Sequence, residues 1–169
     1  MTPASERVVV RPAAPGDVST AVTLMRELAE LEGHASSFTA TAERLADGLF
    51  GAVPGLRCWV AVRDEAVVGV ALCATTWTGI TCRPSLRLLN LVVAADARGA
   101  GAGATLMQAV GAACVELDCT LDWMVRADNF AAQEFYAGLG ATRREGWQVW
   151  QLSREATWRL TSSGSVPAR

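Results

Sequence analysis

Residues 87–117, which read RLLNLVVAADARGAGAGATLMQAVGAACVEL, decide the fold. Before the glycines, an apolar run that ends in Val92 and Val93 is typical of a buried strand. After them, apolar side chains recur at helical spacing, at Leu106, Met107, Val110, Cys114 and Leu117. A helix that begins in a glycine-rich turn exposes unpaired backbone N–H groups and the positive end of its dipole. The stretch therefore favours a ligand that carries phosphate groups.

The spacing of the glycines excludes two common phosphate-binding loops. The Walker A loop requires a Lys, and the chain contains none. Gly99, Gly101 and Gly103 alternate, which does not match the Gly-x-Gly-x-x-Gly pattern of dinucleotide-binding turns. The segment instead resembles the acetyl-CoA loop of the GNAT superfamily of N-acetyltransferases, whose pattern Gln/Arg-x-x-Gly-x-Gly/Ala is matched by Arg98, Gly101 and Gly103. Because the chain has 15 Gly, composition alone is the competing explanation, and the flanking strand and helix argue against it.

Length and composition predict one globular cytoplasmic protein. The chain has 169 residues, of which 51% are hydrophobic and 19% charged. A net charge of −2 with no basic face argues against nucleic acid as a partner. The chain has no long apolar run and its first residues are polar, so neither a membrane segment nor a signal peptide is expected. The five cysteines lack Cys-x-x-Cys spacing, which favours reduced side chains, mostly buried, over disulfides or a metal site.

Hydrophobic periodicity and turn residues predict a single mixed α/β domain over residues 1–169, with an ordered core at 7–160 and a frayed tail at 161–169. Strands are expected at residues 7–11, 57–63, 67–76, 88–93, 120–125 and 147–152. Helices are expected from Asp17 to Gly33, from Thr41 to Gly51, from the glycine turn to Leu117, from Asn129 to Gly138, and at residues 154–160.

A second motif supports the same family. Residues 129–141, NFAAQEFYAGLGA, resemble the second acetyl-CoA motif of the GNAT superfamily. Further likeness to the spermidine/spermine (diamine) N-acetyltransferase branch lies in Glu27–Glu32, Phe50–Gly51, Thr75–Gly79 and Glu145–Trp147. The resemblance implies a GNAT fold, a central mixed and mostly antiparallel twisted sheet of about six to seven strands flanked by helices. It also implies a homodimer, and Trp147, Trp150 and Trp158 would suit either an apolar interface or the core.

The resemblance assigns roles on the acetyl-CoA side. The backbone of Leu91, Val92 and Val93 would run beside the pantetheine and donate an N–H to the thioester carbonyl. The pyrophosphate would be wrapped by Arg98, Gly99, Ala100, Gly101, Ala102, Gly103 and Ala104. Asn129 would bond the pantetheine arm, and Tyr136 would protonate the departing thiolate as general acid. The competing interpretation of Tyr136 is an aromatic that fills the core beside Phe135.

The acceptor side departs from the family pattern. An aliphatic amine with a pKa near ~10.4 must lose a proton before it attacks. The diamine branch carries an adjacent Glu-Asp pair, and Leu89 and Asn90 stand there in this chain. The remaining candidates for the acceptor site are Glu27, Glu30, Glu32, His34 and Asn90, with Asp122 and Trp123 on the following strand. Arg83 and Arg87 would suit an anionic or zwitterionic acceptor such as an amino acid, although ordinary solvated charges explain these residues as well.

The leading functional hypothesis is an acetyl-CoA-dependent N-acetyltransferase that acts on a small-molecule amine, polyamine-like or amino-acid-like, by direct attack without a covalent enzyme intermediate. One alternative is an acyl-CoA-binding module with weak or lost catalysis that serves as a sensor or complex subunit. Another is a structural α/β domain without a cofactor.

Overall fold

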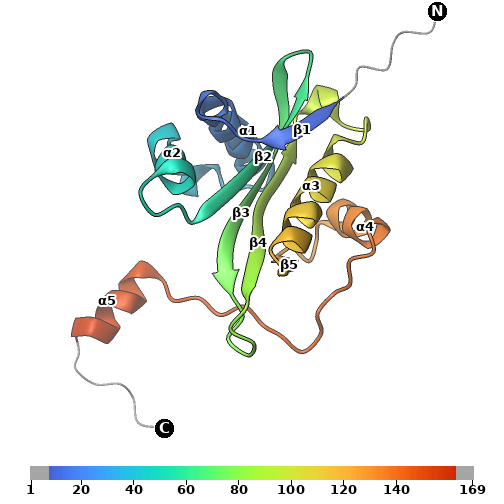
Figure 1. Cartoon of the computed structure of the whole chain (residues 1–169). Helices are drawn as coiled ribbons and strands as arrows, with labels where there is room; N and C mark the ends of the chain where they lie inside the picture. The colour runs from blue at the N-terminus through green and yellow to red at the C-terminus, as the bar shows by residue number, and fades with distance from the viewer. Residues whose placement is uncertain (1–7, 163–169) are drawn as a thin grey trace, which may run out of the picture. The chain divides into compact units, whose positions relative to one another are not determined.

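The computed structural model describes residues 8–162 and divides the chain into two compact units, residues 1–129 and residues 130–169 (Figure 1). The first unit is built on one five-stranded sheet with the strand order β1-β2-β3-β4-β5. Its strands are β1 (Val9–Pro12), β2 (Leu56–Arg63), β3 (Ala66–Trp77), β4 (Pro84–Val93) and β5 (Thr120–Trp123). The first four strands pair antiparallel in sequence order, and β5 pairs parallel to β4.

The connections explain this order. Asp64 and Glu65 both adopt left-handed φ angles, 49° and 65°, which is the geometry of a tight hairpin turn between β2 and β3. Parallel strands need a crossover, and helix α3 (Ala102–Glu116) supplies it between β4 and β5. The predicted strand–turn–helix succession is therefore confirmed, and it lies at the parallel edge of the sheet.

Helices α1 (Val18–Leu31) and α2 (Ala42–Phe50) cover one face of the sheet, and α3 covers the other (Figure 1). Buried side chains of α1 and α2 pack against alternate residues of the strands, including Val60, Val70 and Val92. The predicted helix ends are confirmed. Thr41 Oγ1 accepts a hydrogen bond from the Arg44 N–H at 3.3 Å, and Gly33 adopts a φ of +75° just after α1.

Helix α3 approaches the sheet closely at Gly69 on β3. A Cβ at that position would lie 3.2 Å from Leu106 Cδ1 and 3.3 Å from the Ala61 Cβ. Leu106 and Val110 are fully buried on this face. The glycine thus lets the N-terminal half of α3 sit against the strands, which fixes the start of the helix relative to the end of β4.

The second unit contains helices α4 (Phe130–Gly138) and α5 (Arg154–Ser162). The strand predicted at 147–152 is wrong: these residues are not in a strand, and Trp147 and Trp150 are 69% and 88% exposed. A strand needs a hydrogen-bonded partner, and within the described part of this unit there is none. The sheet accordingly has five strands, fewer than predicted. Residues 161 and 162 of the predicted tail are helical, and 163–169 lie outside the described residues.

Candidate acetyl-CoA and amine site

The loop between β4 and α3 presents free backbone donors. Within residues 8–162, the backbone N–H groups of residues 99–104 donate no hydrogen bond to the protein, and the first bond into α3 is Thr105 N–H to the Gly101 carbonyl at 3.0 Å. Gly99 and Gly101 have φ angles of +80° and +82°, which residues with a Cβ rarely adopt. This conformation leaves the donors at the positive end of α3, so the loop fits an anionic group such as a pyrophosphate.

Charged side chains tie the first half of this loop to the sheet. Arg98 Nε donates to the Val93 carbonyl at 3.0 Å, which draws the loop back onto the end of β4. Asp96, in the short turn η3 (Ala95–Ala97), pairs with Arg63 Nη2 of β2 at 3.0 Å. The Asp96 carboxylate is therefore paired, and the Arg98 terminal nitrogens have no partner among the described residues.

Strand β4 leaves part of its edge without a partner strand. Its pairing with β5 runs only from Ser85 to Leu88, whereas its pairing with β3 continues to Val93. In the described part of the chain, no strand therefore pairs with the backbone groups of residues 89–93 that face away from β3. Leu91, Val92 and Val93, the predicted pantetheine-binding residues, lie in this segment and lead directly into the loop.

A β-bulge lies at the upstream end of that free edge. Asn90 is opposite Leu72 on β3 and Leu88 is opposite Cys73, which leaves Leu89 as the extra residue. Leu89 is 47% exposed, and Asn90 is half-buried on the face that carries α1. Both side chains lie at the predicted place, and neither can accept a proton from an amine.

The acidic candidates at the end of α1 differ in burial. Glu27, Glu30 and His34 are exposed, while Glu32 is half-buried at the C-terminal end of the helix. The pKa of Arg126, after β5, is raised chiefly by its hydrogen bonds to Asp128 and in smaller part by the negative charge of Glu32. The fold thus brings the end of α1 near the segment that follows β5.

Asn129 and Tyr136 follow that segment. The Asn129 N–H donates to the Arg126 carbonyl at 3.1 Å in a turn at the end of the first unit. Tyr136 belongs to the second unit, on α4, where its half-buried ring packs edge-to-face against Phe135 with centroids 5.2 Å apart. Its role as general acid stays a prediction.

Three of the cysteines are poor nucleophiles. Burial raises the pKa of the Cys58, Cys73 and Cys114 thiols to about 12, so they stay protonated at neutral pH. Cys82 is exposed and Cys119 half-buried, so three of the five cysteines are buried, which agrees with the prediction that most of them are. Among residues 8–162 there is no group of His, Cys, Asp and Glu that could hold a metal ion, and no helix long and apolar enough to cross a membrane.

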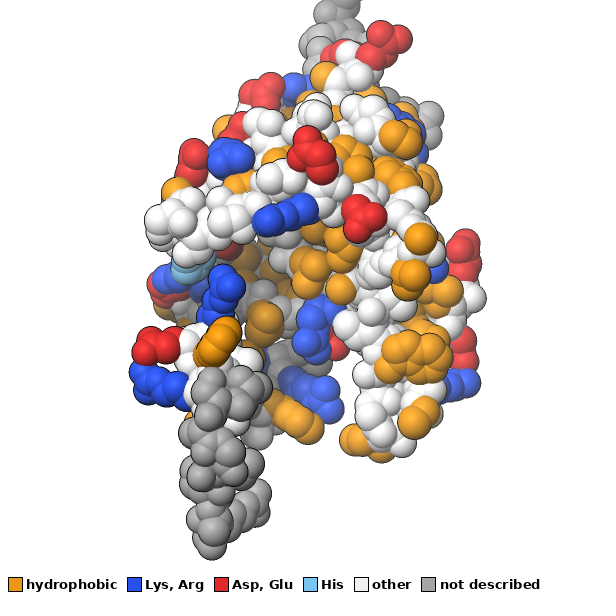
Figure 2. Space-filling model, turned by 90° about the vertical axis from the view of Figure 1, so that its left-hand side faces the viewer, with side chains coloured by type: hydrophobic (Ala, Val, Ile, Leu, Met, Phe, Trp, Pro, Cys, Tyr) orange, Lys and Arg blue, Asp and Glu red, His pale blue; other side chains and the backbone are white. Residues whose placement is uncertain are grey.

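Sequence reasoning missed the ion pair that Arg87 makes with Asp122. Arg87 Nε lies 2.6 Å from Asp122 Oδ1, across the parallel β4–β5 pair. The separation of 35 residues gives no local pattern, so only the register reveals the pair. Figure 2 shows acidic and basic side chains interspersed on the face in view. Among the described residues, this face has no large patch of one charge that would attract a ligand, so individual ion pairs are the features to consider.

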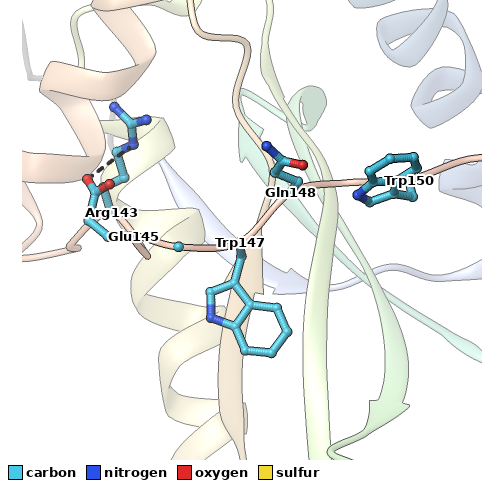
Figure 3. A pocket seen from close by; sticks show the side chains of 6 residues that line it. Arg143, Glu145, Trp147, Gln148 and Trp150 are labelled. Atoms are coloured by element: carbon cyan, nitrogen blue, oxygen red, sulfur yellow. Dashed lines mark ion pairs between the residues drawn. The ribbon is translucent and has the colours of Figure 1, made fainter.

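The second unit has its own open depression. It is lined by Arg143, Glu145, Gly146, Trp147, Gln148 and Trp150. Figure 3 shows Trp147 and Gln148 pointing to opposite sides of an extended chain, with Arg143 and Glu145 paired beside them. None of these residues belongs to the predicted site, and the depression is too shallow and exposed to exclude water from a reaction.

Comparisons with known proteins agree with these features. The family model described as "Acetyltransferase (GNAT) family" matches residues 23–141. The chain is 31% identical to the thialysine N-epsilon-acetyltransferase of Bos taurus, over 88% of this chain and 94% of the bovine protein, and 29% identical to that of Mus musculus, over 87% and 93%.

Solved structures share the fold. An integron cassette protein from the V. cholerae mobile metagenome has a TM-score of 0.75 at 21% identity, covering 92% of this chain and 98% of that one. An aminoglycoside acetyltransferase from an uncultured soil sample has a TM-score of 0.71 at 16% identity, covering 86% and 97%. These findings confirm the resemblance seen in the two motifs, and the chain belongs to the acetyltransferase (GNAT) family.

Proposed function

We propose that the protein is an acetyl-CoA-dependent N-acetyltransferase that acts on a small-molecule primary amine. The observation that carries this proposal is the continuity of two features. Within residues 8–162, the edge of β4 at residues 89–93 has no partner strand on the β5 side, and it leads directly into a loop whose N–H groups at 99–104 have no acceptor in the protein. An extended pantetheine arm followed by a pyrophosphate needs such a succession.

Each residue on this side has a distinct task. The loop and Arg98 bind the pyrophosphate, Asn129 bonds the pantetheine arm, and the free edge at Leu91–Val93 donates an N–H toward the thioester carbonyl. Acetyl-CoA, when bound, supplies an activated acetyl group. Tyr136 donates a proton to the leaving thiolate as general acid. The amine attacks the thioester directly, and the buried Cys58, Cys73 and Cys114 thiols, which stay protonated, form no acyl intermediate.

The amine must lose its proton on the other side of the site. Leu89 and Asn90 cannot accept it. Of the four candidates at the end of α1, Glu32 is the half-buried one, and its negative charge acts on Arg126 in the segment after β5. We therefore assign Glu32, through a water molecule, as the proton acceptor, with Glu27, Glu30 and His34 as solvent-exposed neighbours of a cationic substrate.

The similarity to thialysine N-epsilon-acetyltransferases supports thialysine as the first acceptor amine to test. Thialysine is a lysine analogue whose side chain ends in a primary amine. The homodimer and the cytoplasmic location remain predictions from the sequence, and the exposed Trp147 and Trp150 support an apolar contact with a second copy.

The test is acceptor-dependent release of CoA. The protein is incubated with acetyl-CoA and each of a panel of amines: thialysine, lysine, ornithine, diamines and polyamines. The release of free thiol is followed over time, and the masses of the products are measured by mass spectrometry. Because the chain contains no Lys, its own side chains cannot contribute a background of lysine self-acetylation. We expect release that depends on at least one primary amine and a product heavier by one acetyl group.

The second candidate function is an acyl-CoA-binding module without turnover, which Leu89 and Asn90 favour because they replace the acidic pair. Acetyl-CoA would then raise the melting temperature while no amine in the panel accelerates thiol release. If acetyl-CoA gives no thermal shift and no turnover, both functions are refuted and a structural domain remains.

A further inference from the structure

Arg87 and Asp122 lie on the same sheet face as Asn90, beside the bulge. Leu72 and Ala74 of β3 share one face, because Cys73 between them points to the other. Asn90 is opposite Leu72 and Arg87 is opposite Ala74, so the bulge at Leu89 keeps both on the α1 side. Asp122 joins them through the β4–β5 register.

The ion pair leaves hydrogen-bonding groups free on both partners. Asp122 Oδ1 takes Arg87 Nε at 2.6 Å, and within residues 8–162 no other hydrogen bond or ion pair reaches either side chain. The two terminal nitrogens of the guanidinium and Asp122 Oδ2 are therefore available to a ligand. Binding through Nε also fixes the plane of the guanidinium, which presents its terminal nitrogens as a fork suited to a carboxylate.

The surroundings hold this pair in place and leave it accessible. Ala74, opposite Arg87, contributes only a methyl group. Two residues before Arg87 on β4, the buried Ser85 Oγ donates to the Thr120 carbonyl at 3.1 Å. This bond holds β4 and β5 in the register that places Arg87 opposite Asp122. Arg87 and Asp122 remain 46% and 45% exposed, so a ligand can reach both.

Stability alone is a weak explanation for the pair. A surface salt bridge between side chains this exposed contributes about 0–1 kcal/mol. The geometry is more informative. Arg87 and Asn90 are opposite Ala74 and Leu72, which are two residues apart on β3, so the bulge shortens their separation along the sheet to roughly 7 Å. That separation is comparable to the span from the terminal amine to the α-carboxylate of an extended lysine-like molecule.

We propose that Arg87 and Asp122 select an acceptor that is an α-amino acid with its reacting amine at the end of a lysine-like side chain. The terminal nitrogens of Arg87 bind the α-carboxylate, and Asp122 Oδ2 accepts a hydrogen bond from the α-ammonium. This inference rests on the proposed function and adds the substrate class. Diamines, which lack the carboxylate, are then poorer substrates, and shorter amino acids such as ornithine do not span the distance as well.

The test compares thialysine with bis(2-aminoethyl) sulfide, its close counterpart without the carboxylate, in wild type and in Arg87→Gln and Asp122→Asn. The matched control is Arg83→Gln. Arg83, in the loop before β4, pairs with Asp118, in the loop before β5, at 2.6 Å. The side chains of this pair are more exposed, at 62% and 76%. Melting temperatures verify that all variants fold.

In wild type we expect kcat/KM for thialysine to exceed that for the diamine by about tenfold, the worth of one charge-assisted hydrogen bond. Arg87→Gln should raise KM for thialysine by about the same factor and leave the diamine unaffected or improved, because Asp122 is then free to attract its second ammonium. Asp122→Asn should raise KM for thialysine, and Arg83→Gln should change neither substrate.

Three outcomes would overturn the inference: equal or better use of the diamine by wild type, the same losses in Arg83→Gln as in Arg87→Gln, or a loss in Arg87→Gln that affects kcat for both substrates alike. These outcomes leave the proposed function intact, since acetylation still occurs. A failure of the proposed function looks different, because no amine then releases CoA in wild type.

Discussion

The glycine loop after β4 and the ion pair near the start of β4 lie at the two ends of one strand. They offer a ligand different hydrogen-bonding groups. At residues 99–104 the donors are backbone N–H groups, displayed by left-handed glycines. At the ion pair, the Arg87 side chain donates and the Asp122 side chain accepts, and these two residues are 35 positions apart in the chain. The first region depends on conformation and the second on sheet register. Substitutions should therefore damage one region without the other.

The largest effect is expected from a residue outside both regions. Tyr136→Phe removes the proposed general acid, so kcat should fall by about 10²–10⁴-fold. Acetyl-CoA should still bind, because neither the loop nor the β4 edge changes. Steady-state rates and the acetyl-CoA-induced thermal shift measure the two quantities separately. An intact kcat, or lost acetyl-CoA binding, would remove Tyr136 from this role.

The next effect tests the backbone region. Gly101→Val places a β-branched residue at a φ of +82°, a strain of about 1–3 kcal/mol. The loop should relax out of its binding conformation, and the Kd for acetyl-CoA, measured by calorimetry, should rise about tenfold or more. Gly111→Ala is the matched control within α3, because its Cβ enters open space and its φ is not left-handed. If both variants weaken binding equally, the loop geometry is not responsible.

The sequence predicts the features that depend on local conformation and misses those that depend on sheet register. The strand–turn–helix order, the Thr41 cap and the Gly33 helix end were predictable, because each depends on residues close together in the chain. The pairing of Arg87 with Asp122 and the bulge at Leu89 were not, because both depend on which residue of a distant strand lies opposite.

The wrong strand at 147–152 has a related cause. Residues 147–152, WQVWQL, are rich in residue types that favour strands, which is a local property. A strand also needs a partner, which the described part of the second unit does not provide. In the first unit, β4 extends back to Pro84 beyond its predicted start, because β3 pairs with it over that length.

A smaller effect is expected from Arg98→Met. The side chain donates to the Val93 carbonyl through Nε, and its terminal nitrogens, which bind no other group in residues 8–162, are available to phosphate. Loss of these charge-assisted bonds should raise the Kd for acetyl-CoA by about tenfold at low salt and reduce its salt dependence. An unchanged Kd at every ionic strength would show that the backbone donors act alone.

The smallest catalytic effect is expected at the Arg11–Asp17 pair, which belongs to neither region. Arg11 holds the pKa of the buried Asp17 carboxyl below its usual value through two hydrogen bonds at 2.6 and 2.9 Å. A lowered folded-state pKa stabilises the fold above the unfolded value of about 3.9, and that contribution is lost as pH falls through the lowered pKa.

Asp17→Asn should therefore lower the free energy of unfolding at pH 7 by about 1–2 kcal/mol, with the difference from wild type shrinking below about pH 4. Thermal unfolding between pH 2.5 and 7 measures this, and both KM values should stay as in wild type. A pH-independent difference would place the effect in packing rather than in the ion pair.

We assign the binding of acetyl-CoA to the glycine loop and the binding of the amine to the Arg87–Asp122 region. The most direct test is a two-substrate steady-state measurement on Gly101→Ala, a milder change than Gly101→Val. With the best amine of the panel, we expect KM for acetyl-CoA to rise several-fold, while KM for the amine at saturating acetyl-CoA stays at the wild-type value. A parallel rise in both constants, or an unchanged KM for acetyl-CoA, would contradict the assignment of the glycine loop to the acetyl-CoA side of the site.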